Sequence, residues 1–133
     1  MDIAIHDRVN LVGLFEAIGP LAHTASWRVR GPVQYAADVD IAALDVENHD
    51  TGPWMSGSAF RSQMDSVRLM IDGVFEASLS STGELRSIWV TLRAVDSSWW
   101  EMYGSDIDLI ARIQKHFSDV RPARYTASSV YEI

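Results

Sequence analysis

The sequence predicts an α+β fold: a mainly antiparallel sheet of about five strands with an N-terminal helix and a C-terminal helix packed on it. Three observations predict it. Apolar residues recur at helical spacing near both ends of the chain, they alternate with polar residues in between, and the alternating segments pair so that apolar faces meet. A length of 133 residues is typical of one domain. We therefore expect a single domain over residues 1–133, with an extended C-terminal tail from about residue 122.

The first expected element is a helix within "HDRVNLVGLFEAIGP", residues 6–20. Its apolar positions recur at helical spacing: Leu11, Leu14, Phe15 and Ile18. Asp7 is the expected N-cap, and Gly19 followed by Pro20 ends the helix.

The next segment, "SWRVRGPVQYAADVDI", alternates with period two. Its apolar residues fall on odd positions: Trp27, Val29, Val33, Tyr35, Ala37, Val39 and Ile41. Gly31 and Pro32 interrupt it, so we expect a hairpin with its turn there. The end of this segment, residues 41–46, fits both a strand and a helix. A long loop then follows, with a short helical piece from Ser58 to Met64.

The segment "LMIDGVFEASL" is expected to be one long strand, although Asp-Gly is a favoured tight turn. A turn at Asp72 would place Leu69 opposite Glu76 and mix the faces. A continuous strand instead gathers one apolar face: Val67, Leu69, Ile71, Gly73, Phe75, Ala77 and Leu79. A loop over residues 81–84 then pairs this face with the next strand: Ala77 with Ile88, Phe75 with Val90, Gly73 with Leu92, and Ile71 with Ala94.

Two adjacent tryptophans, Trp99 and Trp100, must point to opposite faces of a strand. A three-residue loop over 96–98 pairs Arg93 with Glu101, which matches charge as well as polarity. Trp100 then joins the apolar face, and Trp99 belongs to a second face.

The second face is the predicted binding surface, as an interface or a ligand site. Its candidate residues are Met70, Asp72, Trp89, Arg93, Trp99, Glu101 and Tyr103. The register also places Val74 and Val95 there. Three possibilities remain for what packs on this second face: a helix of the same chain, a partner or second copy, and a ligand with Arg93 as its anion anchor.

The last expected helix lies in "GSDIDLIARIQKHF", where Ser105 and Asp108 form a capping-box pattern. Its apolar stripe is Leu109, Ile110, Ile113 and Phe117. Lys115 and His116 stand at the negative end of the helix dipole. This stripe is expected to cover the apolar sheet face of Phe75, Val90, Leu92 and Trp100. The tail beyond Pro122 fits an edge strand or arm, or a frayed terminus.

Composition excludes several classes of function. The chain has no cysteine, which excludes disulfides and thiolate chemistry. Eighteen acidic and eleven basic residues give a net charge of −7, which disfavours nucleic-acid binding. No segment resembles a signal peptide or a membrane span, so we expect a cytoplasmic protein with no membrane association.

The sequence shows no catalytic or cofactor motif. The four histidines are scattered, and the acidic loop "DVENHDTG" lacks the spacing of a calcium loop, so no metal or cofactor is expected. A proton-transfer or hydrolytic site built from Asp72, Glu76, Arg93 and Glu101 beside tryptophans remains an alternative.

The leading functional hypothesis is a non-catalytic protein-binding module that acts on a protein partner or on a second copy of itself. A small acidic chaperone-like or immunity-like protein, homodimeric or stoichiometric with its partner, fits this composition. The layout resembles cystatin-like and secretion-chaperone-like folds in architecture alone. The alternative is a small-molecule-binding protein or enzyme with a pocket against the sheet, built from Trp, Asp, Glu and Arg.

Overall fold

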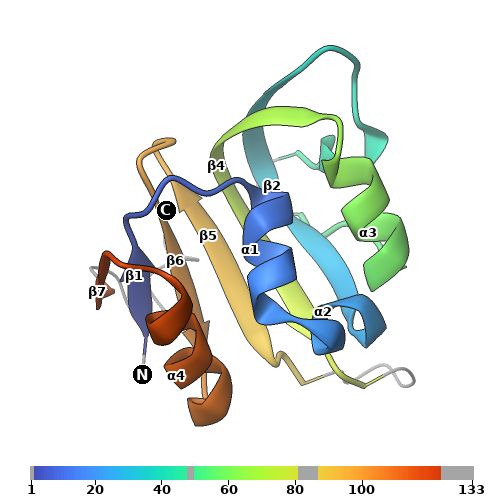
Figure 1. Ribbon diagram of the computed structural model, residues 1–133. Coiled ribbons are helices and arrows are strands. Elements are labelled where there is room, and N and C mark those ends of the chain that lie inside the picture. Colours follow the sequence, from blue (N-terminus) through green and yellow to red (C-terminus); the bar gives the residue numbers. More distant parts are fainter. Residues whose placement is uncertain (1, 48–49, 81–86, 124–133) are drawn as a thin grey trace.

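The computed structural model describes residues 2–47, 50–80 and 87–123. Over these residues the chain forms one antiparallel sheet with helices packed on one of its faces (Figure 1). The predicted α+β class with an antiparallel sheet is confirmed. The described sheet has seven strands instead of about five, in the order β3-β2-β4-β5-β6-β1-β7. The additional strands are two or three residues long, too short to show a period in the sequence.

The strands are β1 (Ile3–Ile5), β2 (Ser26–Ala37), β3 (Met55–Ser56), β4 (Val67–Ser78), β5 (Val90–Val95), β6 (Trp99–Gly104) and β7 (Val120–Pro122). The helices are α1 (Leu11–Ile18), α2 (Pro20–Thr24), α3 (Gly57–Met64) and α4 (Ile107–His116), with a 3₁₀ turn at Ala42–Leu44.

Helix α1 lies where the sequence predicts it, but its expected cap is wrong. The side chain of Asn10, instead of Asp7, accepts the hydrogen bond from the Gly13 amide at 2.7 Å. Gly19 ends the helix with a φ of 96°, a conformation that glycine tolerates. Pro20 then opens the short helix α2, where its missing N–H costs nothing.

The hairpin expected at Gly31 and Pro32 is wrong. β2 is a single strand that pairs with β4 along its whole length, from the Ser26–Ser78 pair to the Ala37–Val67 pair. The register shifts between Arg30 and Gln34, so the Gly-Pro step occupies an irregularity in the ladder. A long-range partner strand therefore overrides the local turn signal.

The predicted continuous strand through Asp72 and Gly73 is confirmed as β4. Its register with β5 differs by two residues from the prediction, because Phe75 lies opposite Leu92 instead of Val90. A shift of two keeps the paired residues, 73–77 of β4 and 90–94 of β5, on their predicted faces. The loop expected at 81–84 lies outside the described residues.

The predicted β5–β6 register is confirmed: Arg93 lies opposite Glu101. The three-residue turn that produces it holds Asp96 and Ser97 at φ values of 54° and 55°. Trp100 lies on the buried, helix-facing side as predicted.

The short helical piece predicted from Ser58 to Met64 is confirmed as α3, and it packs on the sheet (Figure 1). The sheet is therefore not covered by an N-terminal and a C-terminal helix alone, which differs from the expectation. Phe60 of α3 stacks on Trp27 of β2 with ring centroids 5.0 Å apart. In α4, Leu109, Ile110 and Ile113 are buried, as predicted. The tail beyond residue 123 lies outside the described residues.

The cap of α4 differs from the prediction. Asp106, instead of Ser105, accepts the hydrogen bond from the Leu109 amide.

Candidate functional site

Trp99 and Trp100 point to opposite faces of the sheet, as predicted, and the face of Trp99 is the one away from the helices. The indole N–H of Trp99 donates to Glu101 at 3.1 Å, and its ring stacks on His6 with centroids 5.3 Å apart. Its neighbour Trp100 lies under the helical layer and donates its indole N–H to the carbonyl of Val9 at 3.0 Å. Both indoles therefore have an acceptor, one on each face.

Glu101 is the centre of a buried polar network on that face. Its side chain is fully buried, with Arg93 opposite it in the ladder. The Tyr103 hydroxyl donates a hydrogen bond to Glu101, and Tyr103 is only 2% exposed. Burial, and then the bond to Glu101, raise the pKa of Tyr103, so the phenol stays protonated. The network is an internal structural element, because a partner cannot reach Glu101.

An ion pair that the sequence did not predict lies on the same face. Arg28 donates to the buried carboxylate of Glu76 at 2.7 Å. Its guanidinium also lies 4.5 Å from the ring centre of Trp54. No local signal identified Arg28, because its partner follows 48 residues later in the chain. We call the face that carries these residues the polar face: Arg28, Glu76, Arg93, Trp99, Glu101 and Tyr103.

Three of the seven predicted binding residues either lie away from Trp99 and Glu101 or make a structural hydrogen bond. Met70 belongs to the core on the helical side, where it is 7% exposed. Trp89 precedes β5 and donates to Asp106, about 20 Å along the strand from the Trp99 end. Asp72 accepts from the amide of Asp96 at 3.0 Å and so holds the β5–β6 turn.

The same geometry bears on the enzymatic alternative. Glu76 and Glu101 are buried, and Asp72 is bonded to the turn. Over the described residues none of them, nor Arg93, lines the cavity described next. The residues considered for proton transfer are therefore separate from this cavity.

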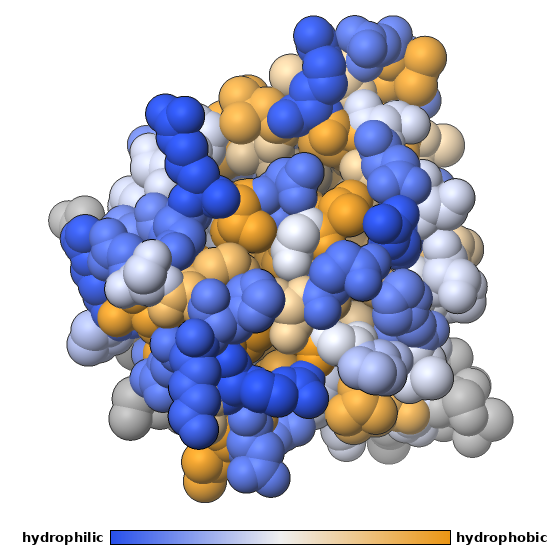
Figure 2. Space-filling model, viewed as in Figure 1, coloured by the Kyte–Doolittle hydropathy of each residue, from blue (hydrophilic) through white to orange (hydrophobic). Residues whose placement is uncertain are grey.

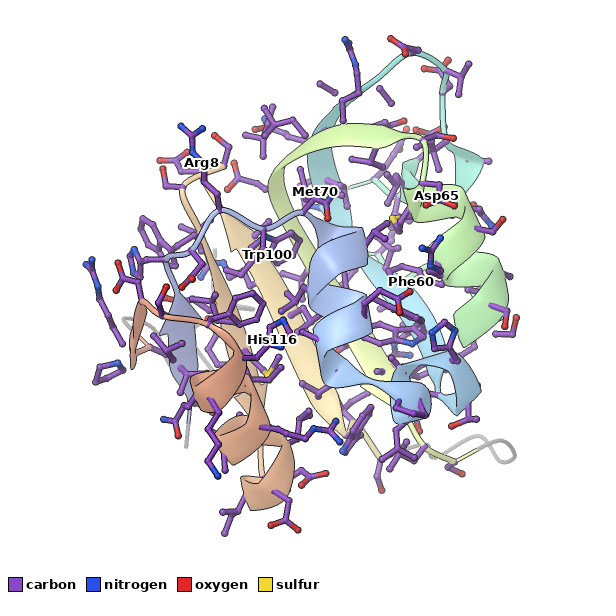
Figure 3. All side chains as sticks on the ribbon, in the orientation of Figure 1. Arg8, Phe60, Asp65, Met70, Trp100 and His116 are labelled. Atoms are coloured by element: carbon purple, nitrogen blue, oxygen red, sulfur yellow. The ribbon has the colours of Figure 1, made fainter. Side chains whose placement is uncertain are left out.

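A cavity of about 640 Å³ opens at the end of the sheet where the β5–β6 turn lies. We call it the turn cavity. It is lined by Asp7, Arg8, Val9, Asn10, Arg68, Leu69, Met70, Ala94, Ser97, Ser98, Trp99 and Trp100. Three stretches of chain form it: the segment before α1, the start of β4, and the β5–β6 turn with its flanks. Figure 3 shows Arg8, Met70 and Trp100 around this region, with Arg8 on the outer side.

The turn cavity has an apolar interior and a rim of hydrogen-bond donors. Met70, Ala94 and Trp100 are buried in its wall, whereas Arg8 and Arg68 are exposed. In Figure 2, hydrophobic surface in the upper central part of the molecule is bordered by hydrophilic side chains. This arrangement suits a ligand group with an apolar body and a polar edge.

Asp7 contributes the carboxylate to the lining of the cavity, and its oxygens are already hydrogen-bonded within the protein. Its oxygens accept from the amide and hydroxyl of Ser118 and from the amide of Asp119, at 2.7 to 2.9 Å. These bonds, that from the Ser118 amide first, lower the pKa of Asp7. At neutral pH it is therefore a fixed anion and a poor proton donor.

Leu69 is the most informative rim residue that the sequence analysis did not select. It lies on the apolar side of the predicted strand, yet its side chain is 46% exposed. The β2–β4 register shifts by one residue between the Gln34–Asp72 and Tyr35–Met70 pairs, so Met70 faces the core and its neighbour Leu69 faces away. The sequence could not reveal this, because a bulge of this kind leaves no local signature.

None of the helices over the described residues has the length and apolar character to cross a membrane. Within the same residues, no three His, Asp or Glu side chains are grouped as metal ligands. Two residues of the acidic loop considered for calcium, 48 and 49, lie outside the described part. Comparisons with protein-family models, with curated proteins and with solved structures found no match to this chain.

Proposed function

We propose that this chain is a non-catalytic protein-binding module that engages its partner at the turn cavity. The observation that carries the proposal is the lining itself: Trp99, Trp100 and Met70 beside Arg8 and Arg68. Trp, Met and Arg are the residue types that protein interfaces select, and apolar side chains in open pockets are typical anchoring points.

Binding is favoured over catalysis by the titratable groups at the cavity. Asp7, Arg8 and Arg68 are the ionisable side chains of its lining. The carboxylate is held by three hydrogen bonds and stays ionised, and a guanidinium has no acceptor site with which to take up a proton. A general acid paired with a general base needs groups that titrate near the working pH.

The proposal moves the contact surface away from the polar face suggested by the sequence. Glu101 and Tyr103 are buried there, whereas Leu69 at the cavity is 46% exposed and would gain burial against a partner. Trp99 belongs to both regions, through its bond to Glu101 and its place in the cavity wall. A chaperone-like or immunity-like role in the cytoplasm, with another protein or a second copy as partner, fits the acidic, cysteine-free composition.

A small-molecule-binding protein is the second candidate. It is favoured by one observation, a cavity volume of about 640 Å³, which lies within the usual range of ligand pockets. It is disfavoured by the exposure of Arg8, Arg68 and Asn10, because specific ligand sites hold the polar groups that orient the ligand in fixed, protected positions.

Selection of a phage-displayed library of random peptides against the wild type tests the proposal. The matched variants are Leu69→Asp and Leu21→Asp, since these leucines are 46% and 45% exposed and only Leu69 lines the cavity. We expect selected peptides to bind the wild type and Leu21→Asp but not Leu69→Asp. Peptides that bind all three proteins equally would contradict the proposal. Arg8→Glu, outside every helix and strand, serves as a second cavity variant if Leu69→Asp does not fold.

Light scattering on the same proteins identifies a self-partner. If the partner is a second copy, the wild type and Leu21→Asp have twice the monomer mass and Leu69→Asp is a folded monomer. If the wild type is monomeric at the highest concentration used, the partner is not a second copy of this chain, and the cavity binds a different protein.

A further inference from the structure

We infer that the turn cavity accepts a partner segment in which a large apolar side chain is flanked by a carboxylate. This inference deepens the proposed function and rests on it. Its basis is the combination of an apolar interior with a rim that offers cations and hydrogen-bond donors.

The charge of the lining is opposite in sign to that of the chain. Two arginines, Arg8 and Arg68, and one aspartate, Asp7, give the lining a formal charge of 2 − 1 = +1, in a chain with a net charge of −7. The Asp7 carboxylate is bonded to the amides of Ser118 and Asp119, so its acceptor capacity is directed away from a ligand. An incoming carboxylate therefore has guanidinium partners at this rim.

The two guanidiniums are accessible to a ligand. Arg8 is exposed and has no ion pair with any residue in the described part of the chain. Arg68 lies 3.4 Å from Asp38, but both side chains are more than half exposed, at 66% and 81%. Such an exposed pair contributes little and exchanges readily for a ligand carboxylate.

Two further polar groups of the lining are already bonded within the protein, which limits what else the interior can recognise. The Trp100 indole N–H is bonded to the carbonyl of Val9, and the Asn10 side-chain oxygen caps α1. The interior walls of Met70, Ala94 and Trp100 then offer apolar contact alone. A large apolar side chain matches this interior, and charge recognition is left to the rim.

A protein segment suits the site better than a free organic acid. Leu69 and Arg8 stand exposed at the edge, so an occupant confined to the interior would leave them in water. A polypeptide extends beyond its anchoring side chain and covers such a rim.

The test uses three capped tripeptides of defined charge, followed through the amide and indole N–H signals of the full chain by NMR. They are acetyl-Asp-Phe-Asp-amide, acetyl-Lys-Phe-Lys-amide and acetyl-Asp-Ala-Asp-amide. We expect the first to shift the signals of Trp99 and Trp100. The lysine peptide should bind at least about threefold more weakly, because two exposed charge interactions are reversed. The alanine peptide should bind about tenfold more weakly, because the apolar anchor is lost.

The double variant Arg8→Gln with Arg68→Gln should remove the preference for the acidic peptide and leave the fold intact. Its matched control is Lys115→Gln with Arg121→Gln, which deletes two exposed cations that do not line the cavity. The control should keep the preference, and equal loss in both double variants would overturn the inference.

Three other results would also overturn it, and they separate it from the proposed function. Equal binding of the lysine and aspartate peptides at the cavity refutes the acidic partner and leaves docking at the cavity intact. Tighter binding of 3-phenylpropionate than of acetyl-Asp-Phe-Asp-amide assigns the site to a free organic acid. If no tripeptide shifts a cavity signal, the acidic-anchor inference fails, and the library selection against Leu69→Asp decides the proposed function separately.

Discussion

Trp99 and Trp100 show how one pair of neighbouring residues serves two faces of the sheet. The alternation of a strand sends the two indoles to opposite sides. Each N–H finds an acceptor, Glu101 for Trp99 and the Val9 carbonyl for Trp100, so neither ring leaves a polar group unsatisfied. The pair also contributes two walls of the turn cavity and so connects the polar face to the proposed docking site.

Removal of the Tyr103 hydroxyl should weaken the buried network measurably. Tyr103→Phe removes the hydrogen bond from the phenol and leaves the fully buried Glu101 carboxyl without that partner, so the free energy of unfolding should fall by about 1–3 kcal/mol. Urea denaturation followed by circular dichroism measures the change. Tyr35→Phe is the control, because its hydroxyl accepts from the Ile41 amide in an uncharged bond worth about 0.5–1.5 kcal/mol. A smaller loss for Tyr103→Phe than for Tyr35→Phe would contradict the role assigned to Glu101.

Asp7 predicts a pH-dependent contribution to stability. Its bonds to Ser118 and Asp119 hold its pKa below the ordinary value of 3.8 in the folded state. A group with a lowered folded pKa stabilises the protein above its unfolded pKa, and that stability is lost as pH falls through the folded pKa. Asp7→Asn keeps one acceptor oxygen, so the variant should melt below the wild type at neutral pH. The gap should narrow as pH falls below 3.8, and a gap that is constant with pH would refute this account.

At the scale of single elements, the N-cap of α4 can be tested by a substitution at Asp106, with the neighbouring Ser105 as the control position. Asp106 accepts from the Leu109 amide and from the Trp89 indole, and these bonds, that from Trp89 first, lower its pKa. Asp106→Ala should lower the free energy of unfolding by about 0.5–2 kcal/mol, the usual range for a lost N-cap. Ser105→Ala, at the cap suggested by the sequence, should change it much less. Chemical denaturation of both variants measures the difference, and the reverse order would show that Ser105 is the cap.

The elements also show which kinds of sequence signal determine a structure. The β5–β6 register could be predicted because Arg93 and Glu101 match in charge, a condition that other registers fail. The β4–β5 register could not, because apolar faces match equally well after a shift of two residues. The turn signal at Gly31 and Pro32 failed because β4, more than 30 residues later in sequence, pairs with both halves of β2.

At the scale of the whole molecule, the sequence predicted a face but not the cavity. The alternation of β5 and β6 was enough to gather Arg93, Trp99, Glu101 and Tyr103 on one side of the sheet. The turn cavity combines residues 7–10, 68–70 and 94–100, and no local period relates segments that distant. Its recognition needs the path of the chain before α1, which depends on Asp7 and its bonds to residues 118 and 119.

Buried and exposed charged side chains have different roles in the folded molecule. The carboxylates of Glu76 and Glu101 are buried and paired or bonded inside the protein, where they specify the polar face. Arg8 and Arg68 remain at the surface beside an apolar cavity, where they can meet a partner. The buried pairs should govern stability, and the exposed arginines should govern binding.

The central claim is that this chain binds its partner at the turn cavity. It is tested most directly by titrating the tightest peptide from the library selection into the wild type, Leu69→Asp and Leu21→Asp. The account predicts that Kd rises at least about tenfold for Leu69→Asp and stays unchanged for Leu21→Asp, because only Leu69 lines the cavity. An unchanged Kd for a folded Leu69→Asp would contradict the account and move the docking surface elsewhere on the molecule.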